Sequence, residues 1–238
     1  MKSLNLAVVG KDVSKSQSPQ IQCFLAKKLG YNVDYKKISV AEGEFVSLTE
    51  KLFNEFDGFN VTIPYKLSII PYLNKVKGDA GVFGAVNTVK TATKTGYNTD
   101  GLGFELMLKN GGVDVNGKNV LVLGAGGAGR SAVKKLTDNG ARVTLYNRSF
   151  EKAQAVANEF KGVIYAGQLQ NKPYYAIVNA TGVGMHETVG FSPVSEQLIS
   201  LCEVAVDLIY EPAQTRFLQI AESFNKKTVN GLAMLFYQ

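Results

Sequence analysis

The stretch VLVLGAGGAGRSAVKKL, residues 120–136, decides the fold class because it joins an apolar run to a glycine-rich turn and a helix-like segment. Gly124, Gly126 and Gly129 satisfy the spacing GxGxxG directly after the apolar run. The first glycine permits the tight turn, the second lets backbone N–H groups approach a pyrophosphate, and the third allows the helix and the strand to pack closely. This setting predicts a dinucleotide-binding loop, and the alternative is a glycine-rich turn that binds nothing.

The segment after the next predicted strand indicates which dinucleotide the loop binds. That strand, 142–146, is followed by Asn147, Arg148 and Ser149, and Lys152 comes one helical turn later. A site for NAD normally places Asp or Glu here, whereas a guanidinium clamps a 2′-phosphate in bidentate fashion. The pattern therefore favours NADP over NAD. The alternative is that Arg148 is a solvated surface residue.

Strands and helices alternate on both sides of this loop. In the second half we expect helices at 101–109, 127–138 and 150–160, with strands at 119–123, 142–146, 175–180 and 203–208. In the first half we expect helices at 18–29 and 42–53, with strands at 4–9, 33–38, 58–63 and 85–89. The alternation predicts α/β architecture with mostly parallel sheets, in two domains that divide near residue 100.

The first expected helix is predicted in more detail. Ser18 is expected to cap it and Pro19 to occupy its first turn. Its apolar stripe is expected to comprise Ile21, Phe24, Leu25 and Leu29.

The composition excludes several classes of protein. The 238 residues include one His (His186) and two widely spaced Cys, which cannot form a common zinc site, so no metal is expected. Cys23 and Cys202 form no CxxC motif, which favours a reducing cytoplasm. No apolar run is long enough to span a membrane. The net charge of +6 comes from scattered Lys and Arg rather than a basic stripe, so a nucleic-acid partner is not expected.

A nicotinamide cofactor implies hydride transfer, which needs a substrate site and a proton donor. With one His in the chain, we expect the donor to be Lys, Tyr or a carboxylic acid. Three polar segments of the first half follow strands or lie in loops: residues 10–19, residues 60–66, and residues 87–88 together with 98–101. Taken singly, each is explained as a loop or a helix cap.

Taken together, these segments resemble the shikimate dehydrogenase family, and the resemblance covers nearly the whole chain. The motifs that carry it are SQSP (16–19), NVTIPYK (60–66), GAVNTV (84–89), NTDGLG (98–103), GAGGAGR (124–130), NRS (147–149) with Lys152, NAT (179–181), DLIYEP (207–212) with Thr215, and NGL (230–232) with Met234, Leu235 and Gln238. The resemblance implies NADP-linked interconversion of 3-dehydroshikimate and shikimate in the chorismate pathway of aromatic amino-acid biosynthesis. It also implies an N-terminal α/β substrate domain (1–100), a Rossmann-type NADP domain with a parallel sheet (101–229) and a return segment (230–238).

The resemblance also implies the roles of individual residues. Lys66 and Asp100 match the catalytic pair, in which the lysine ammonium stabilises the developing oxyanion and supplies its proton. Asn60 lies in the same signature and is expected to be mainly structural. The residues that match substrate contacts are Ser16, Ser18, Thr62, Asn87, Tyr210 and Gln238. The residues that match cofactor contacts are Gly124, Ala125, Gly126, Gly127, Ala128, Gly129, Asn147, Arg148, Ser149, Lys152, Asn179, Thr181 and Gly231.

The sequence departs from the family pattern at several places. Asp12, Lys15 and Gln22 stand where the family often has Pro, His and His, and Gly182 replaces a common Ser. Family members usually continue past the position of Gln238, so a chain ending there would leave the first domain without a covering helix.

Alternative functions remain open at this point. One is a quinate/shikimate paralogue of broader specificity, and another is a non-catalytic NADP-binding module. The expected partners are a small-molecule substrate and no nucleic acid or membrane, with the protein a monomer or homodimer in the cytoplasm.

Overall fold

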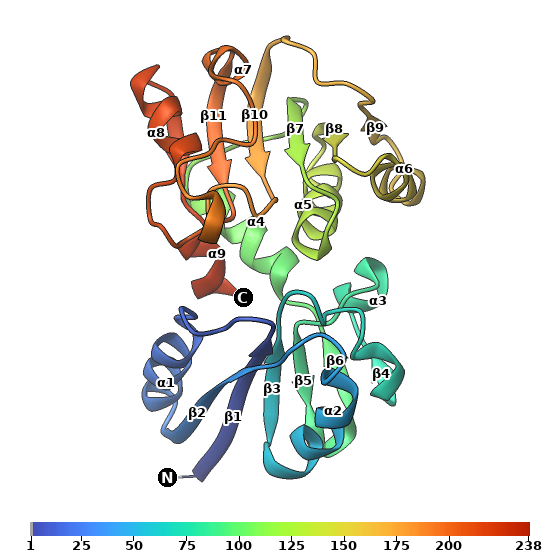
Figure 1. Cartoon of the computed structure of the whole chain (residues 1–238). Coiled ribbons are helices and arrows are strands. Elements are labelled where there is room, and N and C mark those ends of the chain that lie inside the picture. The colour runs from blue at the N-terminus through green and yellow to red at the C-terminus, as the bar shows by residue number, and fades with distance from the viewer. Residues whose placement is uncertain (1) are drawn as a thin grey trace. The chain divides into compact units, whose positions relative to one another are not determined.

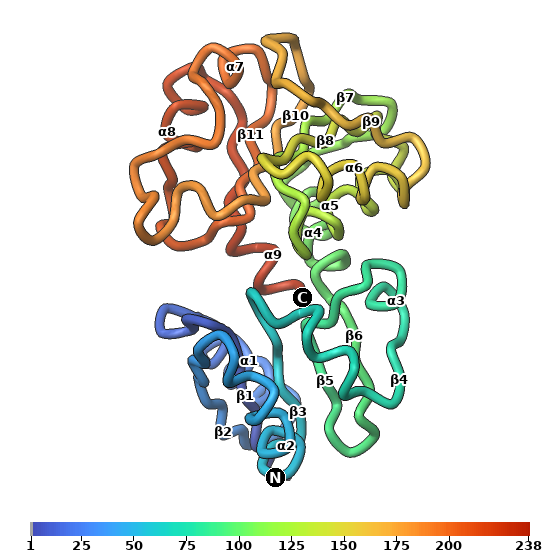
Figure 2. Tube along the Cα trace, turned by 45° about the vertical axis from the view of Figure 1, so that its right-hand side comes forward, coloured from blue at the N-terminus to red at the C-terminus, as the bar shows by residue number. Residues whose placement is uncertain are grey.

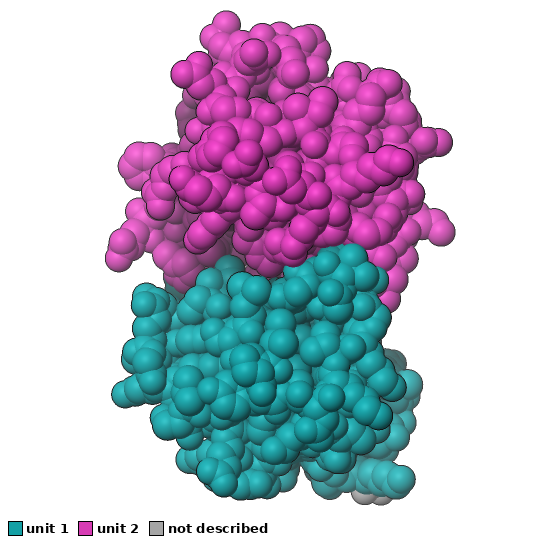
Figure 3. Space-filling model, turned by 90° about the vertical axis from the view of Figure 1, so that its right-hand side faces the viewer, with its two compact units in different colours: residues 1–99 teal, residues 100–238 magenta. Residues whose placement is uncertain are grey.

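The computed structural model describes residues 2–238, which divide into two compact units, one ending at Thr99 and the other beginning at Asp100 (Figure 3). Each unit is an α/β structure built on its own six-stranded sheet. The predicted fold class is therefore confirmed. The finer assignment of 1–100, 101–229 and 230–238 to separate roles stays a prediction. Within residues 2–238, no helix combines the length and the apolar character needed to cross a membrane.

The first unit consists of β1 (Lys2–Gly10), α1 (Ser18–Lys28), β2 (Tyr31–Ser39), α2 (Phe45–Glu55), β3 (Gly58–Val61), β4 (Lys75–Val76), α3 (Asp79–Phe83), β5 (Thr88–Lys90) and β6 (Thr95–Tyr97). Its sheet has the order β2-β1-β3-β5-β6-β4. Strand β1 runs parallel to both β2 and β3, whereas β5 runs antiparallel to β3 and β6. An apolar core that includes Val9, Leu52 and Phe59 joins the sheet to α2.

Two expectations for α1 are wrong. Gln17 occupies the N-cap position and Ser18 is the first helical residue, because the Ser16 hydroxyl accepts the Ser18 backbone N–H at 3.2 Å and already closes the turn before the helix. The expected apolar stripe is also wrong for Phe24 and Leu29, which are exposed, whereas Ile21 and Leu25 are half-buried. Leu29 is the C-cap residue, one position beyond the last helical residue Lys28, and the exposed ring of Phe24 lies under the Lys28 ammonium, 5.6 Å from its centroid.

The second unit consists of α4 (Asp100–Asn110), β7 (Asn119–Leu123), α5 (Gly127–Asp138), β8 (Arg142–Tyr146), α6 (Phe150–Glu159), β9 (Ile164–Tyr165), β10 (Tyr174–Asn179), α7 (Glu196–Ser200), β11 (Cys202–Asp207), α8 (Arg216–Ser223), β12 (Lys227–Val229) and α9 (Leu232–Tyr237). All paired strands of its sheet are parallel, in the order β12-β11-β10-β7-β8-β9. Figures 1 and 2 show the path of the chain through this unit.

The alternating side chains of β7 divide the core of this unit between the two faces of the sheet. Val120 and Val122 of β7 pack with residues of α4, α5 and α6 on one face. Leu121 and Leu123 pack with residues of α7 and α8 on the other face. Because successive side chains of a strand point to opposite faces, an uninterrupted apolar strand such as β7 must be covered on both sides.

The chain order creates a switch point beside β7. After β7 the chain forms β8 and β9 on one side, and then crosses to build β10, β11 and β12 on the other. Leu123 is in register with Tyr146 of β8 and with Asn179 of β10, so these strands end at the same edge. Ligands of open α/β sheets bind at the carboxyl edge where the strand order reverses. The glycine loop that follows Leu123 lies at this position.

Candidate active site

The glycine loop of the second unit connects β7 to the N-terminus of α5. Gly124 has a φ of +105°, a backbone conformation that side chains rarely adopt, and its N–H donates to the carbonyl of Tyr146 at 2.8 Å. A Cβ built on Gly129 would lie 2.1 Å from the Gly124 carbonyl oxygen, so α5 reaches β7 only because residue 129 has no side chain. The turn thus requires Gly124, and the packing of α5 on β7 requires Gly129.

Gly126 differs from the other two glycines of the motif. A Cβ built on this residue meets no atom within 4 Å, and Gly126 is exposed at the N-cap of α5. No protein contact explains a glycine here, and the open space lies beside the N–H groups and the positive dipole end of the helix. This arrangement fits the pyrophosphate of a dinucleotide.

The loop after β8 is fastened to the glycine loop by Asn147. The Asn147 Oδ1 atom accepts the Ala125 N–H at 3.2 Å, and its Nδ2 donates to the carbonyl of Ser149 at 3.0 Å. Arg148 and Lys152 are exposed beside this link. The Ser149 hydroxyl donates to Glu151 Oε2 at 3.1 Å, and backbone and Ser149 hydrogen bonds lower the pKa of Glu151. Two exposed cations therefore flank a loop of fixed position, as an anionic 2′-phosphate would require.

The ends of β10 and β11 are joined by a buried polar network around Asp207. Asp207 accepts hydrogen bonds from Thr215 Oγ1 at 2.6 Å, from the Ile209 N–H at 3.0 Å and from Asn179 Nδ2 at 3.1 Å. Asn179 Oδ1 in turn accepts the Thr181 hydroxyl at 2.6 Å and its N–H at 3.1 Å. The network fixes the loops that follow both strands at the carboxyl edge of the sheet.

Burial governs the protonation of Asp207. The residue has no exposed surface, and this desolvation raises the pKa of its carboxyl to about 6, although the three donors act to lower the pKa. Sequence reasoning placed Asp207 and Thr215 in a family-like motif without giving either a role. The spacing of the motif could have suggested that Thr215 caps α8, since its hydroxyl also accepts the Leu218 N–H.

The first unit brings together several of the residues predicted to contact substrate. Ser16 and Ser18 are half-buried at the start of α1, and the Ser16 hydroxyl donates to Ser18 Oγ at 3.1 Å. Thr62 follows β3, and its N–H donates to the carbonyl of Val9 at 2.8 Å, which extends the pairing of β3 with β1. Lys66 follows in the next turn, where its carbonyl accepts the Val86 N–H at 2.8 Å.

Asn87 is held by the residues around it. Its Oδ1 accepts the Thr99 N–H at 3.0 Å and the Thr88 hydroxyl at 2.9 Å, and its Nδ2 donates to Thr99 Oγ1 at 2.9 Å. Asn60 Nδ2 donates to the carbonyl of Asn87 at 3.1 Å. Asn60 therefore has structural bonds, as expected of it, and these bonds fix the predicted substrate contact Asn87.

The second unit packs Gln238 against α4, the helix that begins at Asp100. Asp100 is buried at the start of α4, where a helix dipole favours an acidic residue. Helix α9 packs on α4 so closely that a Cβ on Gly103 would lie 2.6 Å from the carbonyl oxygen of Met234 and 3.1 Å from Gln238 Cβ. Gln238 thus lies beside the first turn of α4.

The remaining two predicted residues follow β11 and β12. The Gly231 N–H donates to the carbonyl of Ile209 at 3.2 Å, which fastens Gly231 to the loop that carries half-buried Tyr210. Lys66 belongs to the first unit and Asp100 to the second. Their pairing, and the ligand contacts of all the predicted site residues, stay predictions.

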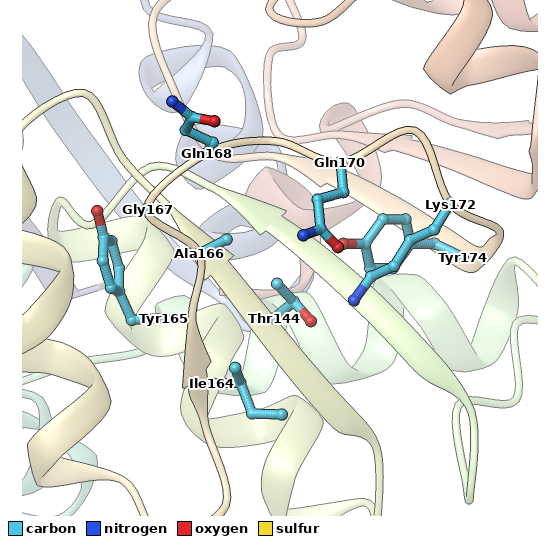
Figure 4. A pocket seen from close by; sticks show the side chains of 9 residues that line it. All are labelled: Thr144, Ile164, Tyr165, Ala166, Gly167, Gln168, Gln170, Lys172 and Tyr174. Carbon is cyan, nitrogen blue, oxygen red and sulfur yellow. The ribbon is translucent and has the colours of Figure 1, made fainter.

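A separate hollow of about 240 Å³ lies over β8 and β9 (Figure 4). Its walls come from Thr144, from Ile164 and Tyr165 of β9, and from the loop that leads to Tyr174. These residues are distinct from those of the glycine loop and the Asp207 network, so the hollow is not part of the predicted site.

Comparison with known proteins relates both units to one family. The model described as the shikimate dehydrogenase substrate binding domain matches residues 8–89, and the model for shikimate/quinate 5-dehydrogenase matches residues 105–180. A shikimate dehydrogenase (NADP⁺) from Carboxydothermus hydrogenoformans is 38% identical over an alignment of 249 positions, gaps included, which spans 97% of this chain and 87% of that protein.

Two solved structures are similar over almost the whole chain. A shikimate dehydrogenase from Peptoclostridium difficile has a TM-score of 0.91 and 34% identity, covering 99% of this chain and 88% of its own. The shikimate 5-dehydrogenase of Thermus thermophilus, in complex with NADP(H) and shikimate, has a TM-score of 0.87 and 37% identity. The match covers 98% of this chain and 88% of that one.

Gly126 and Gly129 are expected to respond differently to substitution by alanine. Gly126→Ala should fold with the stability of the wild type but bind NADP⁺ weakly, because its methyl group enters only the open space. Gly129→Ala should lose about 1–3 kcal/mol of unfolding free energy, because its methyl group overlaps the Gly124 carbonyl. Urea denaturation and calorimetric titration with NADP⁺ measure the two effects. Wild-type NADP⁺ affinity in Gly126→Ala would contradict the assignment of the space.

The raised pKa of Asp207 predicts a pH dependence of stability. Between about pH 4 and pH 6 the unfolded chain loses this proton while the folded protein keeps it. The stability that this group contributes is therefore complete below about pH 4 and is lost as the pH rises through 6, by about 3 kcal/mol.

Asp207→Asn keeps an acceptor for Ile209 and Asn179 and a donor for Thr215, and removes the titration. The unfolding free energy of the wild type minus that of Asp207→Asn should fall as the pH rises from 4 to 6.5, in parallel denaturation series. The exposed Asp34→Asn serves as the control. A pH-independent difference would show that the Asp207 pKa is not raised.

Proposed function

The chain belongs to the shikimate dehydrogenase family, and on this premise we propose that it catalyses the reversible, NADP-dependent reduction of 3-dehydroshikimate to shikimate. The observation that carries the proposal is the match to NADP-dependent relatives through both units, 97% of the chain in the example from Carboxydothermus hydrogenoformans. The open space at Gly126 and the exposed Arg148 support it from the geometry of the second unit.

The two units have different proposed roles. We propose that the first unit binds the substrate and that the second binds NADP at its glycine loop. The N–H groups at the start of α5 would hold the pyrophosphate, and Arg148, Ser149 and Lys152 would hold the 2′-phosphate. When bound, NADPH supplies the hydride for the reduction.

Lys66 is the proposed acid of the reaction. As the ketone carbon accepts hydride, negative charge develops on its oxygen, and the ammonium of Lys66 stabilises this charge and transfers a proton from Nζ. In the oxidative direction, the neutral amine accepts the proton of the substrate hydroxyl. Asp100 would orient the ammonium and accept hydrogen bonds from substrate hydroxyls. The hydroxyl and amide side chains of Ser16, Ser18, Thr62, Asn87 and Gln238 suit a polyhydroxylated carboxylate.

We also propose a cytoplasmic enzyme that is a monomer or a homodimer. Cys23 and Cys202 are both free thiols, as is usual for proteins of reducing compartments. Sedimentation equilibrium of the purified chain distinguishes the two oligomeric states.

The activity is tested by following NADPH formation from shikimate and NADP⁺, with quinate and NAD⁺ as alternative substrates. Lys66→Ala should lower kcat by about 10²- to 10⁴-fold, because the proton donor is gone. Lys90→Ala, which removes an exposed lysine of β5, is the matched control and should keep wild-type turnover. Near-wild-type turnover in Lys66→Ala would remove Lys66 from the mechanism, and an inactive wild type would refute the proposed reaction.

Arg148 sets the preference for NADP in this proposal. Arg148→Ala should raise KM for NADP⁺ by roughly ten- to a hundredfold, because charge-assisted hydrogen bonds to the 2′-phosphate are lost. KM for NAD⁺ should hardly change, and the effect on NADP⁺ should shrink at high ionic strength. Steady-state kinetics with both cofactors measures this, with the exposed Arg216→Ala as control. An equal effect on both cofactors would rule out a role at the 2′-phosphate.

A further inference from the structure

Thr88 is the first residue of β5, which lies between β3 and β6 in the sheet of the first unit (Figure 1). It is in register with Asn60 of β3, so the two side chains lie on the same face of the sheet. The Thr88 hydroxyl accepts a hydrogen bond from Asn60 Nδ2 at 3.0 Å and donates one to Asn87 Oδ1 at 2.9 Å. Thr88 therefore bridges the amides of Asn60 and Asn87.

Two backbone groups fix which atom of each amide faces Thr88. The backbone carbonyl of Asn87 can only accept, so the end of the Asn60 amide that contacts it at 3.1 Å is Nδ2. The backbone N–H of Thr99 can only donate, so the end of the Asn87 amide that contacts it at 3.0 Å is Oδ1. The Thr88 hydroxyl must then accept from Asn60, and its single proton goes to Asn87. The bond from the Tyr35 hydroxyl to Asn60 Oδ1, at 2.5 Å, agrees with this orientation.

The orientation of the Asn87 amide decides what this predicted substrate contact offers to a ligand. An amide rotated by half a turn would exchange its acceptor for its donors. Asn87 is buried, and a reversed amide would turn its N–H groups toward the Thr99 N–H, a contact between two donors. The Thr88 hydroxyl and the Thr99 N–H both donate to Oδ1, so together they hold the amide in one orientation.

We propose that Thr88 is a positioning residue for the substrate, whose hydroxyl holds the Asn87 amide in the orientation that binds it. The inference rests on the proposed function, because it takes Asn87 as a contact of a polyhydroxylated carboxylate. Thr88 acts through Asn87 and is assigned no contact of its own with substrate or cofactor. Through Asn60, the same hydroxyl ties the orientation of Asn87 to the neighbouring strand β3.

Thr88→Val tests the proposal because valine keeps the β-branched shape of the side chain and lacks the hydroxyl. KM for shikimate should rise by about three- to tenfold, the equivalent of one lost hydrogen bond. Both kcat and KM for NADP⁺ should stay within about twofold of the wild type, because the proposed proton donor and the cofactor loop are unchanged. A general structural defect would change all three constants.

Thr88→Ser is the conservative variant, since it removes the methyl group and keeps the hydroxyl. Its KM for shikimate should stay within about twofold of the wild-type value, because serine can make both hydrogen bonds of Thr88. A role of Thr88 in packing alone predicts the opposite order, with valine tolerated and serine impaired.

The matched control is Thr91→Val, which removes another threonine hydroxyl from the first unit. Thr91 follows the last residue of β5, and its hydroxyl donates to the carbonyl of Asp57 at 2.7 Å. This variant loses a hydrogen bond of the same kind at the other end of the strand, so it should leave KM for shikimate unchanged. Circular dichroism of all variants shows whether they are folded.

A double-mutant cycle with Asn87→Ala distinguishes action through Asn87 from a separate effect. Its readout is the dissociation constant for shikimate from calorimetric titration, which needs no turnover. In the Asn87→Ala background, Thr88→Val should weaken shikimate binding no further, because the amide that Thr88 orients is gone. Full additivity of the two effects would overturn the proposal, as would an unchanged KM in Thr88→Val alone.

A second variant covers the case in which Thr88→Val does not fold. Thr88→Ala removes the hydroxyl and adds no atom that could overlap the Asn60 amide. It should also raise KM for shikimate while kcat is preserved; an unchanged KM overturns the proposal. An active wild type with an unaffected Thr88→Val refutes the role of Thr88 alone. A wild type that does not oxidise shikimate refutes the proposed function and the role of Thr88 together.

Discussion

The close approach of α5 to β7 is the constraint on which the second unit depends. A Cβ at residue 129 would lie 2.1 Å from the carbonyl oxygen of Gly124, so the distance between helix and strand is set by the backbone itself. This approach brings the N-terminus of α5 to the carboxyl edge of the sheet, beside the switch point. The loops after β8 and β10 are then fastened around the same edge by Asn147 and Asn179.

Local patterns predicted the elements of this region accurately. The strands 119–123 and 142–146 and the helix 127–138 have the bounds that their apolar runs and glycines indicate. Each is defined by neighbours in sequence, since alternating burial, turn residues and helix ends act over a few residues. The short strands β4, β6, β9 and β12 were not expected, because segments of two or three residues carry no periodic signal.

The polar networks of the site could be predicted only in part. The motif residues Asn60 and Asp207 are recognisable in the sequence, but their partners Tyr35 and Asn179 lie 25 and 28 residues away. Such bonds depend on the register of strands whose paired residues lie far apart along the chain, as with Asn179 and Asp207 in β10 and β11. The helix begins at Ser18 as predicted, but the prediction that Ser18 is its N-cap failed for a local reason, because Gln17 takes the cap position and the Ser18 N–H is bonded by the Ser16 hydroxyl.

If the first unit binds the substrate as proposed, the fixed orientation of two of its amides bears on the entropy of binding. Asn60 and Asn87 each use both ends of the amide within the protein, so neither side chain is free to rotate before a ligand arrives. Their dipoles are set when the unit folds, and folding has already met the cost of ordering them. A ligand that matches these dipoles then loses mainly its own freedom on binding, which is the thermodynamic advantage of a preorganised polar surface.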